Sequence, residues 1–212
     1  MTTLLTAGTL VVSQRAKLVE LTNQYEITDP QGAALGAIHE VGQRRLRKTV
    51  RFATSVDQFL THRLSVHDAA GTEVLQITRP AKLLKSRLVV RAGDGRHVGE
   101  IIQDNVLGRI RFGLVGGDGR HLGWIRAENW RAWDFSIVDR DEREIARIDK
   151  KFVGIAKAVF TTADHYVVTI DRSVDGNLRS LVIGSAAAVD TALKQDPRGL
   201  DITDVADIIG LG

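Results

Sequence analysis

The 212-residue chain contains no cysteine and no long apolar run. The absence of cysteine excludes disulfides, zinc–thiolate sites, thiol catalysis and iron–sulfur clusters. No stretch approaches the roughly 20 apolar residues that a bilayer-spanning helix needs. The N-terminus lacks a basic lead and a full apolar core, so no signal peptide is expected. We therefore expect a cytoplasmic protein, and the abundance of Ala, Arg, Gly and Asp favours a bacterial source.

The chain has enough apolar residues, 43%, to build a sizeable core. Its formal charge of +3 is unevenly placed, because residues 196–212 carry four Asp against one Arg. We predict one domain over residues 1–195, followed by an acidic tail over residues 196–212 that either is mobile or adds a short helix. A modest basic excess permits contact with phosphates or anionic lipid without requiring either.

Five segments of the chain repeat one pattern. Each opens with apolar residues two positions apart, which is typical of a β-strand because such side chains share a face. Each then meets a turn, and the five turns are centred on Asp29, Asp68, Asp94, Asp118 and Asp141. Four turns carry a glycine at one aligned place and the fifth carries Glu142. The pattern predicts a series of β-hairpins.

After the aligned glycine, apolar residues fall at the third and sixth positions, as in Val98 and Ile101. A spacing of three would put them on opposite faces of a regular strand. Four of the five segments have a small residue between the pair: Gly36, Gly99, Gly123 and Ala146. We infer a β-bulge that returns both apolar residues to one side. A helix is the competing interpretation, but the runs are too short and too rich in glycine.

Further strands are expected at residues 9–15, 16–23, 50–62 and 158–171, for a total of about a dozen. So many strands should close into a barrel or split into a sandwich. Residues 178–194 break the pattern, since they are apolar or small on every side from Leu181 to Val189. A helix that is apolar all round must be buried. It is too short to span lipid, so we place it inside the barrel.

This order of elements, with the opening TLVVSQRAKLVELTN, the hairpin series and FTTADHYVVTID before the apolar helix, resembles the phospholipid scramblase and LURP-one-related families. Those families share the Tubby-like fold. The resemblance implies a mainly β protein with an antiparallel, closed barrel of about 12 strands around a central C-terminal helix. It also implies a lipid-related role, since scramblases are proposed to move phospholipids between leaflets and Tubby domains bind phosphoinositides.

The scramblase calcium segment corresponds to the stretch that starts at Phe160. Thr162 stands where the family has its first acid, Asp164 is kept, and Ser173 replaces another acid. Calcium needs several carboxylate oxygens, so we predict no calcium site. The Pro-rich region and the cysteine cluster of animal scramblases are also missing.

Two basic clusters are the candidate contacts for lipid phosphates. The first comprises Arg44, Arg45, Arg47, Lys48 and Arg51; the second comprises Arg79, Lys82, Lys85, Arg87 and Arg91. Alternation would place Lys85, Arg87 and Arg91 on one strand face. The alternative is a solvated loop or edge strand, where such charges discourage aggregation.

Other candidate sites are weaker. Trp124, Trp130 and Trp133, close to Phe135, could anchor a membrane interface or pack across strands. The six histidines show no metal-chelating spacing, and nucleophile, dinucleotide and phosphate-loop motifs are absent. We expect a non-enzymatic module with no cofactor, which binds anionic phospholipid or a protein partner and no nucleic acid, and which is at most peripheral at the inner membrane face. The alternatives are a phospholipid scramblase and a barrel that carries a small ligand or serves as a scaffold for partners.

Overall fold

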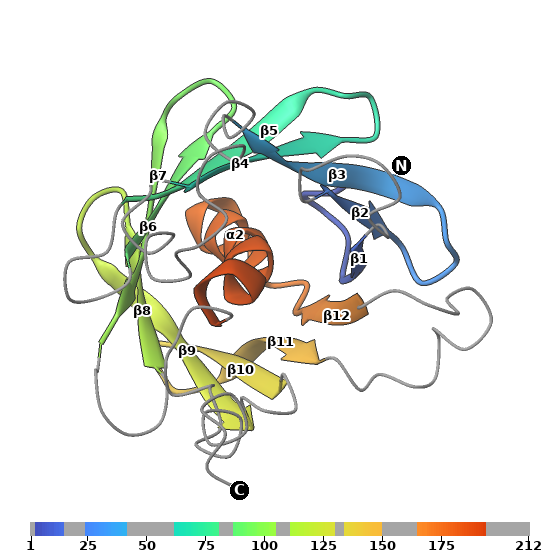
Figure 1. The fold of residues 1–212 in the computed structure, drawn as a ribbon. Helices are drawn as coiled ribbons and strands as arrows, with labels where there is room; N and C mark the ends of the chain where they lie inside the picture. Colours follow the sequence, from blue (N-terminus) through green and yellow to red (C-terminus); the bar gives the residue numbers. More distant parts are fainter. Residues whose placement is uncertain are drawn as a thin grey trace, which may run out of the picture.

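The computed structural model describes residues 3–14, 24–41, 62–80, 87–104, 111–129, 134–149 and 165–193. Twelve antiparallel strands close into one barrel around a helix (Figure 1), and each strand pairs with its neighbours in the chain while β1 pairs with β12. The strands are β1 Thr9–Gln14, β2 Gln24–Thr28, β3 Ala34–Val41, β4 His62–Asp68, β5 Glu73–Arg79, β6 Arg87–Ala92, β7 His97–Gln103, β8 Arg111–Gly116, β9 His121–Asn129, β10 Asp134–Asp139, β11 Glu144–Asp149 and β12 His165–Ile170. The predicted closed barrel of about 12 strands is confirmed.

All five predicted hairpins are present, and each contains the predicted bulge. In the β6–β7 hairpin, for example, Val90 pairs with Gly99 while Arg91 pairs with His97, so Val98 is the extra residue. The same shift occurs in the other four hairpins. Consequently Ile101 and its four repeat equivalents are all inward-facing and almost fully buried.

The turn glycines are needed for their backbone conformation. Gly32, Gly71, Gly95 and Gly119 have φ values between 80° and 87°, in the left-handed region that a side chain disfavours. Glu142 occupies the same place in the fifth turn with a φ of 64°. The Asp side chains stabilise the turns as expected, since Asp29 Oδ1 accepts hydrogen bonds from the backbone N–H groups of Gln31 and Ala33. In the fifth turn Asp139, and not the predicted Asp141, plays this part.

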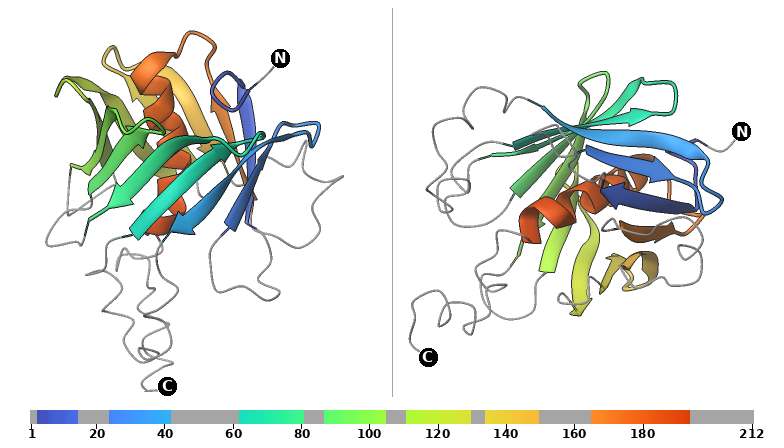
Figure 2. Two further views of the ribbon diagram at one scale, coloured as in Figure 1. Left: turned by 90° about the horizontal axis from the view of Figure 1, so that it is seen from above. Right: turned by 45° about the vertical axis from the view of Figure 1, so that its right-hand side comes forward.

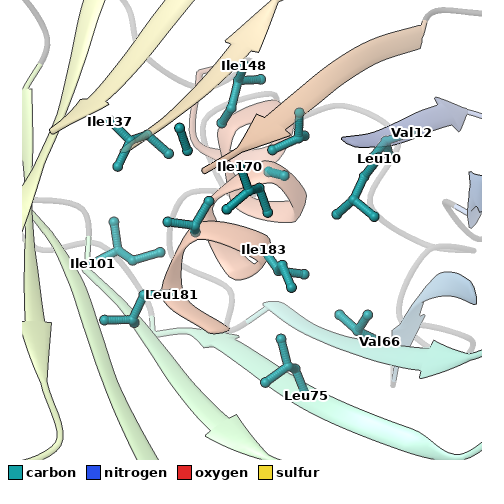
Figure 3. Packing of buried hydrophobic residues seen from close by; sticks show 14 of the residues in the cluster. Leu10, Val12, Val66, Leu75, Ile101, Ile137, Ile148, Ile170, Leu181 and Ile183 are labelled. Carbon is teal, nitrogen blue, oxygen red and sulfur yellow. The ribbon is translucent and has the colours of Figure 1, made fainter. Parts of the chain in front are cut away.

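Helix α2, Gly176–Leu193, runs through the barrel, close to the bounds predicted from the sequence. Leu181, Val182 and Ile183 are at most 3% exposed, and side chains from strands all around the barrel point towards the helix (Figure 3). Gly184 lets the helix approach the wall closely, because a Cβ there would lie 3.3 Å from Val90 Cγ2. On the other side, the Tyr166 hydroxyl donates a hydrogen bond of 2.7 Å to the Ala186 carbonyl. The predicted burial is confirmed for the part of this helix whose side chains are described, from Leu181 to Ala186.

The barrel has two different ends, visible in Figure 2 (left) with the helix lying between them. At the hairpin end lie the five turns, the segment of residues 171–175 that leads into α2, and the N-terminal residues 3–8. The strand ends that face the other way define the second end. Within the described part of the chain, no helix has both the length and the hydropathy that crossing a bilayer requires.

Some predictions fall outside the described residues. These are the strands at 16–23 and 50–62, except His62, and the tail over residues 196–212 with its optional short helix. The division into a domain and a tail therefore stays a prediction.

Candidate functional site

The connections at the two ends of the barrel differ in charge. Taken between the strand bounds, the hairpin turns together with residues 171–175 carry five Arg against seven Asp and Glu, a net charge of −2. The six chain segments that join strand ends at the second end carry 14 Lys and Arg against four Asp and Glu, a net charge of +10. The positive charge of the chain is thus concentrated in segments attached to one end of the barrel.

The first predicted basic cluster and two of the five members of the second lie in these second-end connections. Arg44, Arg45, Arg47, Lys48 and Arg51 lie in the segment between β3 and β4, and Lys82 and Lys85 lie in the segment between β5 and β6. All seven lie outside the described residues. The strands that flank them are consecutive in the barrel, and the ends that these segments join face the same way. The two clusters could form one basic surface, but the sequence alone could not show that they are adjacent; the topology attaches them to neighbouring strands.

Arg87 and Arg91 are exposed on the same face of β6, as alternation predicted. Arg87 is already engaged, because its guanidinium donates two hydrogen bonds to the Glu100 carboxylate on β7. That contact raises the pKa of Arg87. Arg91 Nη1 donates to the Gly95 carbonyl, 3.2 Å away. Part of the charge in the second cluster is therefore neutralised within the barrel wall.

The prediction that Arg79 belongs to a basic surface cluster is wrong. It is only 4% exposed and lies at an inward-facing position of β5. Two other inward positions near the second end are also polar, Glu40 on β3 and Gln103 on β7, and both are buried. The barrel interior thus changes from apolar to polar towards the second end, and Arg79 belongs to this interior and not to the outer surface.

A buried arginine that the sequence analysis missed lies at the hairpin end. Arg179 in the first turns of α2 is 8% exposed, and it donates hydrogen bonds to the carbonyls of Val174 and Ala7. Burial lowers the pKa of Arg179. These contacts attach the N-terminal segment to the start of the helix. No sequence pattern distinguishes Arg179, near the start of the predicted helix, from an exposed arginine.

The segment that resembles a calcium site is only partly described. Thr162 and Asp164 lie outside the described residues. Ser173 is exposed, and both its hydroxyl and its backbone N–H donate to Asp171 Oδ1, at 2.6 Å and 2.8 Å. The hydrogen bond from the Ser173 hydroxyl lowers the pKa of Asp171. Among the residues that the structure describes, no group of three or more His, Asp or Glu converges to hold a metal ion.

Trp124 and Phe135 lie on opposite faces of the barrel wall. Trp124 lies on the outer face of β9, where the guanidinium of Arg111 stacks 4.6 Å from its ring centre and His121 packs at 4.4 Å. Phe135 points inward and is 1% exposed. Trp124 therefore packs across strands on the outside, while Trp130 and Trp133 lie outside the described residues.

The barrel, the helix through it and the hairpin series are the features that suggested a family from the sequence. A model of the family described as Scramblase matches residues 1–193. The chain belongs to the scramblase family. The match covers the whole barrel and helix α2 of this scramblase-family protein and leaves out the acidic tail. No curated protein and no solved structure matches the chain.

Proposed function

We propose that this scramblase-family protein is a non-enzymatic module that associates peripherally with anionic phospholipid through the second end of its barrel. The segregation of charge between the two ends carries the proposal. A basic residue near an anionic membrane contributes about 1 kcal/mol of binding free energy, and this attraction falls off within a Debye length of about 8–10 Å. Charges gathered at one end can act together on a flat surface, whereas the same charges spread around the barrel could not.

The packing of α2 supports a contact made by the outside of the molecule. The described interior is filled by the helix and by inward side chains such as Ile77, Ile101 and Ile148, all at most 1% exposed. A helix held in this way has a structural role. The filled interior also gives no support to a barrel that carries a small ligand.

Vesicle flotation with the full chain tests the proposal. We expect binding to vesicles that contain roughly one third phosphatidylserine, weakening as salt rises, and little binding to pure phosphatidylcholine. Replacing Arg44 and Arg45 by Glu should weaken binding at least 30-fold, since two lost contacts correspond to about 2 kcal/mol. The matched control replaces Arg120 and Arg140, which are exposed at the hairpin end, by Glu and should bind like the wild type.

Two results would count against the proposal. Salt-sensitive binding that survives the Arg44→Glu and Arg45→Glu changes would remove this cluster from the contact. A wild-type chain that binds neither kind of vesicle would refute lipid association and favour the alternative of a protein partner for the same basic end.

Membership of the scramblase family supports a second candidate, transbilayer movement of phospholipid. Reconstitution in vesicles with a reporter lipid, with and without calcium, tests this activity. Transport by the wild type would establish it, and the predicted loss of the calcium site implies that calcium would make no difference. No transport under either condition excludes it.

A further inference from the structure

Two histidines that are far apart in the sequence lie side by side on the outside of the barrel. His39 on β3 and His67 on β4 have ring centres 5.3 Å apart with an angle of 63° between the ring planes. The pairing register places them on diagonal positions of one face, since Ala37 is opposite His67 and Ser65 is opposite His39. Their spacing of 28 residues gave no sequence signal.

A chain of hydrogen bonds determines which nitrogen of His67 carries the proton. The Glu73 carboxylate accepts from the Ser65 hydroxyl and, at 2.5 Å, from Gln76 Nε2. A carboxylate oxygen accepts hydrogen bonds, so Ser65 and Gln76 are the donors in these two contacts. The Ser65 hydroxyl therefore donates its hydrogen bond to Glu73. The Ser65 oxygen can then accept a hydrogen bond from the Nε2–H group of His67, 3.5 Å away.

This arrangement leaves the other ring nitrogen of His67, Nδ1, without a proton, so that it carries a lone pair. Nδ1 of His67 is buried and has no hydrogen-bond partner. A buried polar atom without a partner costs about 1–3 kcal/mol. A metal-binding histidine usually donates a hydrogen bond from the ring nitrogen that does not bind the metal. The acceptor of this hydrogen bond orients the ring and raises the basicity of the metal-binding nitrogen.

We propose that His39 and His67 bind a divalent transition-metal ion of the zinc class, with His67 bound through Nδ1 and with Ser65 and Glu73 as its outer partners. Imidazole nitrogens suit zinc, nickel and copper. Two rings that each place a nitrogen about 2.0–2.1 Å from one ion in tetrahedral geometry have centres roughly 5 Å apart, which agrees with the observed separation. Among the described residues no third His, Asp or Glu converges on the pair. This site goes beyond the proposed lipid contact and does not depend on it.

Isothermal titration of Zn²⁺ into the chelator-treated full chain tests the site. We expect one zinc ion per chain that His39→Gln or His67→Gln abolishes. The positioning residue Ser65 should matter less, with Ser65→Ala weakening binding about tenfold. The control is His121→Gln, because His121 also lies on the outer face, beside Trp124, and should leave zinc binding unchanged. Binding that is absent in the wild type, or equal in the wild type and both glutamine variants, overturns the proposal.

A second measurement does not depend on how the variants fold. Long-range ¹H–¹⁵N spectra of the metal-free wild type should show His67 protonated on Nε2, and zinc should shift the His39 and His67 ring signals while those of His121 stay in place. A His67 ring protonated on Nδ1, or ring signals that do not respond to zinc, would also refute the site.

Discussion

The two ends of the barrel are built in different ways. At the hairpin end, five turns repeat one solution, with a left-handed residue, a bulge and an Asp that accepts backbone hydrogen bonds. At the second end, the connections range from four residues, 130–133, to 20 residues, 42–61, and share no common turn sequence. A tight turn accepts few residue types at each position, because its backbone dihedral angles favour Gly, Asn or Asp. The connections at the second end carry the excess of positive charge.

The largest loss of stability is expected from adding a side chain to a bulge glycine near the hairpin end. A Cβ on Gly99 would lie 2.2 Å from the Val115 carbonyl oxygen, and the φ of Gly99 is 156°. Gly99→Ala should therefore lower the free energy of unfolding by about 3 kcal/mol, the cost of forcing the strands apart. Urea denaturation measures this.

The matched variant is Ala146→Gly, because Ala146 holds the aligned place in the fifth hairpin and already carries a Cβ. It should cost only about 1 kcal/mol. If both variants lose the same free energy of unfolding, the strands at Gly99 are not packed more closely than those at Ala146. Vesicle binding by the folded fraction should be unchanged in both, since neither touches the second end.

A smaller effect is expected at Arg179, which joins the N-terminal segment to α2 at the hairpin end. Arg179→Met removes two hydrogen bonds to buried carbonyls, while the relief of burying a charge offsets part of the loss. We expect a loss of about 2 kcal/mol in the free energy of unfolding. The exposed neighbour Arg172 is the control, and Arg172→Met should stay within about 0.5 kcal/mol. Equal effects of the two changes would mean that the Arg179 contacts do not stabilise the hairpin end.

The sequence predicted what local periodicity encodes. The hairpins, their bulges and the buried helix follow from the positions of Asp, Gly and apolar residues, and all are confirmed. Contacts between distant segments carry no such signal. The inward direction of Arg79 and the contact of His39 with His67 depend on how β3, β4 and β5 align across the barrel. The charge difference between the ends likewise emerged only when the strand directions were known.

The next prediction concerns acid stability. The pKa of Glu73 is lowered chiefly by the Ser65 hydrogen bond, that of Glu142 by Arg126 and that of Asp171 by Ser173. A carboxyl whose pKa is lower in the folded state stabilises the fold above its unfolded value, and this stabilisation is lost as the pH falls through the folded value. The urea midpoint should therefore decline as the pH drops below the ordinary values of 4.5 for Glu and 3.8 for Asp. Glu73→Gln should flatten this decline, and a midpoint that rises from pH 5 to pH 3 would contradict the assignment.

The smallest expected effect tests the one turn that departs from the repeat. Glu142 adopts a φ of 64° where the other four turns have glycine, and its carboxylate pairs with Arg126. Glu142→Gly and Glu142→Ala both remove this ion pair, so their difference isolates the backbone. Glycine tolerates the left-handed conformation and alanine does not, so the Gly variant should melt about 2–4 °C above the Ala variant. The melting temperatures are measured by circular dichroism. Equal values would mean that the left-handed backbone conformation at residue 142 does not limit the stability of this turn.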